Sequence, residues 1–185
     1  MIIGISGVAK SGKDTLFKLL NMKEDLFSRF AFADELKSDL RDLLLEKFNI
    51  DLNNCSPEEK ELIRPIMVSY GVCARNIDNN FWINKISTKI QSFSSPRIPI
   101  ITDVRYENEQ NFIRKQSKES ILIYVERSGF PPINEEEEKN DFKLKKNSDY
   151  TLRWSSFSNP LKIEEGFPKV EELFNETIKR WRPNI

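Results

Sequence analysis

The stretch Gly7-Val8-Ala9-Lys10-Ser11-Gly12-Lys13-Asp14-Thr15 decides the fold of this chain of 185 residues. Its first seven residues match the spacing G-x-x-x-x-G-K, in which glycines let the backbone curl until several N–H groups point at one centre. Apolar residues 1–6 before it predict a buried strand, and residues 13–21 predict a helix. A helix N-terminus adds positive potential to such a loop. The sequence therefore predicts a phosphate-binding loop, or P-loop.

The end of this loop indicates which chemistry it serves. Lys13 is placed to reach the β- and γ-phosphates of ATP. Asp14 stands where a serine or threonine usually follows the lysine, and Thr15 comes next. Asp14 either binds Mg²⁺, directly or through water, or complements the positive end of the helix dipole; both interpretations remain open. The expected ATP contacts in the loop are Gly7, Ala9, Lys10, Ser11, Gly12, Lys13, Asp14 and Thr15.

The composition excludes several classes of function. With no histidine, the chain has no Ser-His or Cys-His nucleophile pair and no histidine base or metal ligand. Phosphoryl transfer to an anionic acceptor needs no strong base, so it remains open. Lys+Arg and Asp+Glu are both 29, and this zero net charge argues against a nucleic-acid partner.

The apolar runs and the two cysteines indicate where the protein is located. No apolar run is long enough for a leader or a membrane span, so no membrane partner is expected. Cys55 and Cys73 have a spacing that suits neither a disulfide framework nor a zinc site. A cytoplasmic location is expected.

Strands alternate with helices along the chain, which predicts an α/β fold with a parallel sheet covered on both faces. We expect one domain over residues 1–185. The helices within about 34–93 exceed what one crossover needs and predict a substrate-binding insert. Expected strands are 1–6, 29–33, 98–102, 121–125 and 150–154; expected helices are 13–21, 34–48, 56–70, 81–93, 107–116 and one from residue 168 that includes Trp181.

Local signals set some of these boundaries. Ser56-Pro57-Glu58-Glu59 combines a capping box with proline at the first helical position, so a helix begins there. Gly71 is expected to end or bend that helix. Residues 128–147, which hold Gly129, two prolines and a run of glutamates, predict a mobile loop, giving a lid over about 127–147.

Gly12-Lys13-Asp14-Thr15 resembles the phosphate loop of bacteriophage deoxynucleoside monophosphate kinases. Three further segments are similar to that family: residues 32–37, the insert with Arg64-Pro65 and Arg75, and the run Asp103-Val104-Arg105-Tyr106-Glu107-Asn108-Glu109. The resemblance covers about residues 2–127. It implies a P-loop NTPase three-layer sandwich with a helical insert and a lid, ATP and Mg²⁺ as cofactors, and a nucleoside monophosphate as acceptor. It also implies that Arg64, Gly71, Trp82, Asp103, Arg105 and Glu109 lie at the acceptor or reaction site.

The residues after the third long strand carry the strongest catalytic expectation. Asp103 lies at the sheet edge where ligands bind in open α/β folds, and either binds Mg²⁺ through water, orients Arg105 or caps a helix. Arg105 either bridges donor and acceptor phosphates with its planar fork or forms a structural ion pair. Arg127 opens the expected lid and is assigned to ATP. Metal ligands are expected among Asp14, Thr15 and Asp103.

Insert residues are assigned to the acceptor. Arg64 is expected at the acceptor phosphate, with Lys37 and Arg75 as weaker candidates, against the alternative of exposed surface cations. Trp82 either stacks on the acceptor base or is a core aromatic. Glu109 either holds Arg105 or a sugar hydroxyl, or lies on a solvated helix face.

Two departures and two rival functions stay open. Val68 and Val72 stand where similar proteins often carry glutamine and threonine, so the family's base-recognition contacts are not expected to carry over in detail.

Animal-type phosphomevalonate kinases share a Gly-Lys-Asp loop and an Asp-x-Arg after a strand, so a small-molecule kinase is the first alternative. A non-catalytic ATP-binding module is the second. The sequence leaves a homodimer open, and for a phage-encoded chain the expected location is the host cytoplasm.

Overall fold

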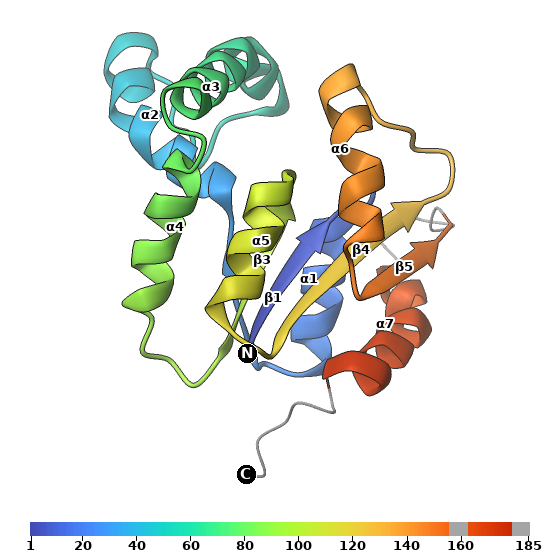
Figure 1. The fold of residues 1–185 in the computed structure, drawn as a ribbon. Coiled ribbons are helices and arrows are strands. Elements are labelled where there is room, and N and C mark those ends of the chain that lie inside the picture. Colours follow the sequence, from blue (N-terminus) through green and yellow to red (C-terminus); the bar gives the residue numbers. More distant parts are fainter. Residues whose placement is uncertain (156–162, 179–185) are drawn as a thin grey trace. The chain divides into compact units, whose positions relative to one another are not determined.

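The phosphate loop follows the central strand of a parallel sheet (Figure 1). The computed structural model describes residues 1–155 and 163–178. Within these residues five strands pair in the order β2-β3-β1-β4-β5, every pair parallel. Their bounds are β1 (Ile2–Ser6), β2 (Phe27–Phe30), β3 (Ile98–Val104), β4 (Ser120–Arg127) and β5 (Tyr150–Trp154). The predicted α/β fold is confirmed.

Helices cover both faces of this sheet, because strands buried on two sides need an apolar cover on each (Figure 1). Helix α1 (Lys13–Lys23) and helix α7 (Phe167–Leu173) lie on one face. Helix α5 (Glu107–Gln116) and helix α6 (Glu135–Lys146) lie on the other. A short 3₁₀ turn, η1 (Ile163–Gly166), precedes α7, and a π-helical turn, η2 (Phe174–Ile178), follows it. Trp181 lies outside the described residues.

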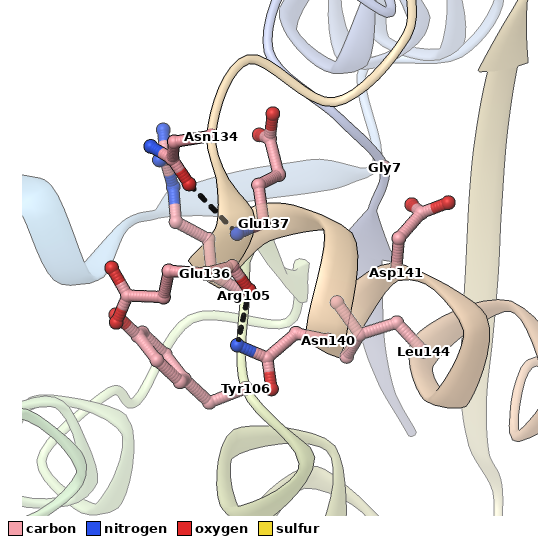
Figure 2. Close-up of a pocket in the computed structure, with 9 residues that line it drawn as sticks. All are labelled: Gly7, Arg105, Tyr106, Asn134, Glu136, Glu137, Asn140, Asp141 and Leu144. Atoms are coloured by element: carbon pink, nitrogen blue, oxygen red, sulfur yellow. Dashed lines mark hydrogen bonds between the residues drawn. The ribbon is translucent and has the colours of Figure 1, made fainter.

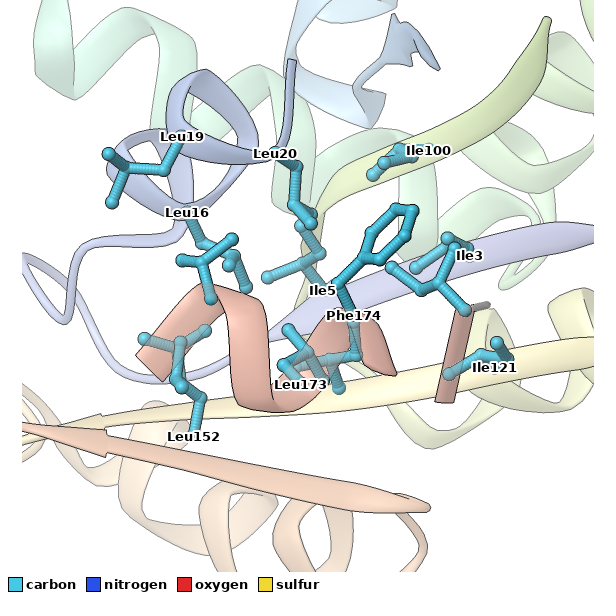
Figure 3. Close-up of a cluster of buried hydrophobic side chains, with 14 of the residues drawn as sticks. Ile3, Ile5, Leu16, Leu19, Leu20, Ile100, Ile121, Leu152, Leu173 and Phe174 are labelled. Carbon is cyan, nitrogen blue, oxygen red and sulfur yellow. The ribbon is translucent and has the colours of Figure 1, made fainter. Parts of the chain in front are cut away.

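The main core lies between β1, β3, β4 and β5 and the helices α1 and α7 (Figure 3). Leu16, Leu19 and Leu20 project from α1 onto the strands, at the spacing of one helix face. Leu173 and Phe174 complete this layer from the last helical segment. Each fully buried side chain of this size contributes about 1.5–3 kcal/mol of transfer free energy. The core therefore fixes α1, and with it the end of the phosphate loop.

The chain forms two compact units, Met1–Phe30 with Ser94–Ile185, and Ala31–Phe93. The second is helical and contains α2 (Phe32–Phe48), α3 (Pro57–Ile77) and α4 (Phe81–Gln91). Leu40, Leu44, Leu52 and Ile63 form its own small core. The capping box that begins α3 is confirmed: the Ser56 hydroxyl accepts from the Glu59 N–H, and the Glu59 carboxylate accepts from the Ser56 N–H.

Two local expectations were wrong. Strand β2 spans Phe27–Phe30 instead of 29–33, because Phe32 and the residues after it enter α2. Helix α3 continues through Gly71 to Ile77. A Cβ at Gly71 would lie 3.0 Å from Leu36 Cδ1, so this glycine allows close packing of α2 and α3 and does not end the helix.

The segment 128–147 is not one loop, since α6 occupies most of it. Asn134 caps α6 by accepting from the Glu137 N–H, four glutamates fill the first turn, and lysines fill the last turn. Acidic residues at the N-terminus and basic residues at the C-terminus both complement the helix dipole. Across the part of the chain that the structure covers, every helix is too short or too polar to pass through a membrane.

The strand order places a topological switch point at the phosphate loop. From β1 the chain crosses to β2 through α1 on one face, and from β3 it crosses to β4 through α5 on the other face. The loops after β1 and β3 therefore leave the sheet in opposite directions at its carboxyl edge. Ligands of open α/β sheets bind at such a point.

Candidate active site at the phosphate loop

The phosphate loop depends on two glycines with positive φ. Gly7 has φ 138° and Gly12 has φ 98°, in the region that glycine adopts without steric cost. A Cβ at Gly7 would lie 2.3 Å from the Val125 carbonyl oxygen and 2.7 Å from Ser11 Oγ. A side chain at this position is therefore excluded by space as well as by conformation.

Trp154, at the end of β5, lies under the loop. A Cβ at Gly12 would lie 2.7 Å from the Trp154 ring, and the indole Nε1 donates to the Ser11 carbonyl oxygen at 2.9 Å. Trp154 is 8% exposed. Sequence reasoning missed this residue, although its position in a predicted parallel strand places it at the same sheet edge as the loop.

Lys13 lies among the charges of the site. Its Nζ donates to the Gly7 carbonyl at 2.6 Å and to the Val8 carbonyl at 2.8 Å. Burial, and then the positive charge of Arg105, lower the pKa of Lys13 from 10.5 to about 8, against opposing contributions from Glu137, Asp14 and Asp103. The loop, the end of β3 and α6 thus place one lysine, one arginine and three carboxylates within electrostatic reach.

The loop has the chemistry that a phosphate requires. The Ser11 hydroxyl is buried, and the described residues offer it no hydrogen-bond partner. Backbone N–H groups, this hydroxyl and a buried ammonium are the donors that phosphate oxygens accept from. An orphaned buried donor costs free energy until a ligand satisfies it. The residues present fit an anionic phosphate group.

Asp14 and Asp103 are the two carboxylates near the loop lysine that the sequence assigned to Mg²⁺. Asp14 is 79% exposed in its side chain, 4.0 Å from Arg29 Nε, and Thr15 is half-buried beside it in the first turn of α1. Among the described residues no group of three or more Cys, Asp or Glu side chains is arranged to hold a metal. One or two carboxylates such as Asp14 and Asp103 are enough for Mg²⁺, because this ion usually keeps several waters and is also bound by the substrate phosphates.

Glu109 fixes the backbone around Arg105. Glu109 is 2% exposed, and its carboxylate accepts from the Arg105 N–H at 2.7 Å and from the Tyr106 N–H at 3.2 Å. Of the alternatives left open for Glu109, the solvated helix face is excluded, because Glu109 is the third residue of α5 and its side chain turns back onto the helix start. It holds Arg105 through the main chain, which leaves the exposed guanidinium side chain for other partners.

Helix α6 closes over this region (Figure 2). Ala9 N–H donates to Glu137 Oε1 at 2.7 Å, and the Tyr106 hydroxyl donates to Glu136 Oε1 at 2.7 Å. A cavity of about 50 Å³ remains beneath the helix, which is room for a water molecule but not for a nucleotide. It is lined by Gly7, Arg105, Tyr106, Asn134, Glu136, Glu137, Asn140, Asp141 and Leu144. Sequence reasoning missed Glu137, because its signal lay within a run of four glutamates.

Arg127 ends β4 beside the loop. Its Nη1 donates to the Lys10 carbonyl at 3.4 Å, and its guanidinium lies 4.5 Å from the centre of the Phe130 ring. Its Nε is buried and has no hydrogen-bond partner in the part of the chain that the structure describes. Arg127 therefore has donor capacity left at the edge of the phosphate loop.

The residues of the helical unit that were assigned to the acceptor differ in burial, and two of them are buried. Trp82 is 3% exposed, donates from Nε1 to the Gly71 carbonyl at 3.3 Å and packs edge-on against Tyr70. This placement favours a core aromatic over a base-stacking ring. Gly71 is buried at the same helix contact.

The cations of the helical unit are more accessible. Arg64 is exposed and paired with Glu61 at 2.6 Å. Lys37, 3.8 Å from Asp34, lines an open cavity of about 310 Å³ together with Arg41 and Asn53. Arg75 is half-buried on α3.

Comparison with known proteins supports the fold. The sequence matches no known family and no curated protein. Similar solved structures include TT1252 from Thermus thermophilus, with 13% identity over 99% of this chain and 98% of that chain and a TM-score of 0.50. They also include dephospho-CoA kinase from Campylobacter jejuni, with 14% identity over 97% of this chain and 98% of that chain and a TM-score of 0.52. At these identities the similarity shows the fold alone, an α/β fold that the chain shares with both structures.

Proposed function

We propose that the protein is a kinase that transfers the γ-phosphoryl group of ATP to a nucleoside or deoxynucleoside monophosphate. The observation that carries the proposal is the grouping of Lys13 with Asp103 and Arg105 at the sheet's switch point, beside a loop with an orphaned buried hydroxyl. Transfer between phosphates requires positioning and charge neutralisation and no strong base. A chain without histidine is suited to that reaction.

In this mechanism the loop N–H groups and Ser11 bind the donor phosphates. Lys13 exchanges its two carbonyl partners for phosphate oxygens and follows the charge that develops on the leaving group as the bond to the β-phosphate breaks. Arg105 binds oxygens of both donor and acceptor, and Arg127 binds the donor. Asp14, Thr15 and Asp103 would hold Mg²⁺, which supplies charge neutralisation on the phosphates.

The acceptor assignment rests on the resemblance to phage deoxynucleoside monophosphate kinases and on the cations of the helical unit. Lys37, Arg64 and Arg75 are candidates for the acceptor's phosphate. The exposed guanidinium of Arg64 would have to leave its ion pair with Glu61 to bind the acceptor. A surface ion pair contributes about 0–1 kcal/mol, so the cost of breaking it is small. Trp82 is given no contact with the base.

The test is a coupled assay of ADP release with Mg·ATP and a panel of acceptors. The panel holds the ribo- and deoxyribonucleoside monophosphates, phosphomevalonate and dephospho-CoA. Lys13→Ala should abolish turnover, while Lys18→Ala, one turn further along α1 and exposed, should retain it. No ADP release with any nucleotide, together with turnover of another acceptor, would reject the nucleotide assignment. Slow hydrolysis that no acceptor accelerates would indicate an ATP-binding module instead.

A further inference from the structure

A carboxylate lies against the phosphate loop in this structure. Glu137 Oε1 accepts from the Ala9 N–H at 2.7 Å, the short distance typical of a charge-assisted hydrogen bond. The same main-chain donor belongs to the cradle in which the proposed function places a phosphate. We propose that Glu137 is a built-in competitor of the donor nucleotide, so that ATP binds only when the first turn of α6 moves off the loop.

The Glu137 carboxylate is held in place on both oxygens. Its second oxygen accepts from the Ile133 N–H at 2.9 Å, and its own N–H donates to Asn134 Oδ1 at 2.8 Å. In a reciprocal capping box, a glutamate at this position would bond only to the start of its own helix. Here one oxygen serves the helix start and the other serves the phosphate loop, 128 residues away in sequence.

The neighbouring glutamates make different contacts. Glu136 accepts from the Tyr106 hydroxyl, and Glu138 is exposed. Glu137 is also the glutamate of this run whose charge acts on Lys13. The Glu137 carboxylate thus resembles a bound phosphate in two respects: it accepts a hydrogen bond from the loop, and its charge acts on the Lys13 ammonium. Two anions cannot share these donors, so binding of one displaces the other.

The structure also indicates which part of α6 moves. Its C-terminal half is anchored by the buried Leu144, whose carbonyl accepts from Gln110 Nε2 at 2.9 Å. In the first turn Glu135, Glu136 and Glu138 are exposed and Glu137 is half-buried, so less packing is lost when this turn moves. It is preceded by exposed residues that include Gly129, with φ 83° and open space around it. The expected motion is a swing of the first turn about the Leu144 end.

The inference rests on the proposed binding of ATP to this loop, and the experiment separates the two. Calorimetry near neutral pH measures the affinity for ATP of the wild type, Glu137→Gln and Glu137→Ala. Removing the competitor raises the fraction of the binding-competent state, so both variants should bind about tenfold more tightly. Glu138→Gln changes the net charge equally, on the same helix turn, and should bind like the wild type.

Hydrogen exchange of the same proteins reports the motion. The Ala9 amide should be protected in the nucleotide-free wild type and should exchange faster in Glu137→Gln. ATP should accelerate exchange in the first turn of α6 of the wild type. Equal or weaker ATP binding by both Glu137 variants would overturn the inference and leave the proposed function standing. Absence of ATP binding by all the proteins would overturn both.

Discussion

The indole N–H of Trp154 donates to the carbonyl oxygen of Ser11, and the Trp154 ring fills the space beside Gly12. This contact joins the last strand of the sheet to the phosphate loop, across 143 residues of sequence. Parallel pairing of β5 with β4 brings Trp154 opposite Arg127, at the carboxyl edge of the sheet. The shape of the loop thus depends on a residue that has no part in its sequence motif.

Trp154→Phe should weaken ATP binding with little effect on the chemical step. The variant keeps an aromatic ring beside Gly12 but loses the donor to Ser11, and a buried hydrogen bond of this kind is worth about 1 kcal/mol. We expect a rise of about fivefold in KM for ATP with kcat nearly unchanged. Tyr150→Phe, at the other end of β5, is the control and should leave KM unchanged. A loss in kcat with normal KM would contradict the positioning role.

ATP affinity should fall as pH rises through about 8. Burial and the charge of Arg105 lower the pKa of Lys13 from 10.5 to about 8, so the free protein loses the ammonium above that pH. A bound phosphate stabilises the ammonium and raises its pKa again, so binding takes up a proton in this range. Titrations of affinity against pH, in buffers of different ionisation enthalpy, measure both effects.

Lys13→Arg is the matched variant for this dependence. Arginine stays charged at every pH in that range, so the affinity of the variant, although lower, should not fall through pH 8. The same decline in both proteins would assign the pH dependence to another group.

Arg105→Ala should reduce kcat by about 10³-fold, the size expected for an arginine that stabilises the transferring group. Because Glu109 holds the Arg105 main chain, the substitution should leave the fold intact. Arg97→Ala removes an arginine just before the same strand, at the opposite edge of the sheet, where Arg97 pairs with Asp25. Steady-state kinetics with saturating ATP make the comparison, and a modest, equal loss in both variants would make Arg105 structural.

Trp82→Phe should lower stability and leave acceptor recognition alone. The substitution removes the N–H that donates to the Gly71 carbonyl, at a cost of about 1 kcal/mol in the free energy of unfolding. Urea denaturation measures that loss, and KM for the acceptor should be unchanged. A large rise in acceptor KM at normal stability would restore the base-stacking interpretation.

Much of the fold was predictable because its signals are local. The G-x-x-x-x-G-K spacing, the apolar run before it and the capping box at Ser56 each act within a few residues. Asp103 and Arg105 could be placed at the same sheet edge as Lys13, because all strands of a parallel sheet end there. The helix α6 was missed, although Asn134 followed three residues later by Glu137 is an N-terminal helix signal.

The sequence thus determined that this chain has a phosphate-loop motif, that its sheet is parallel, and that any chemistry it performs runs without histidine. Tertiary structure alone decided that Trp154 supports the loop, that Glu137 occupies it, and that Trp82 is buried. The difference is physical. Motifs and hydrophobic periodicity report contacts within one turn or one strand, whereas these three contacts form only after the packing of distant elements brings their side chains together.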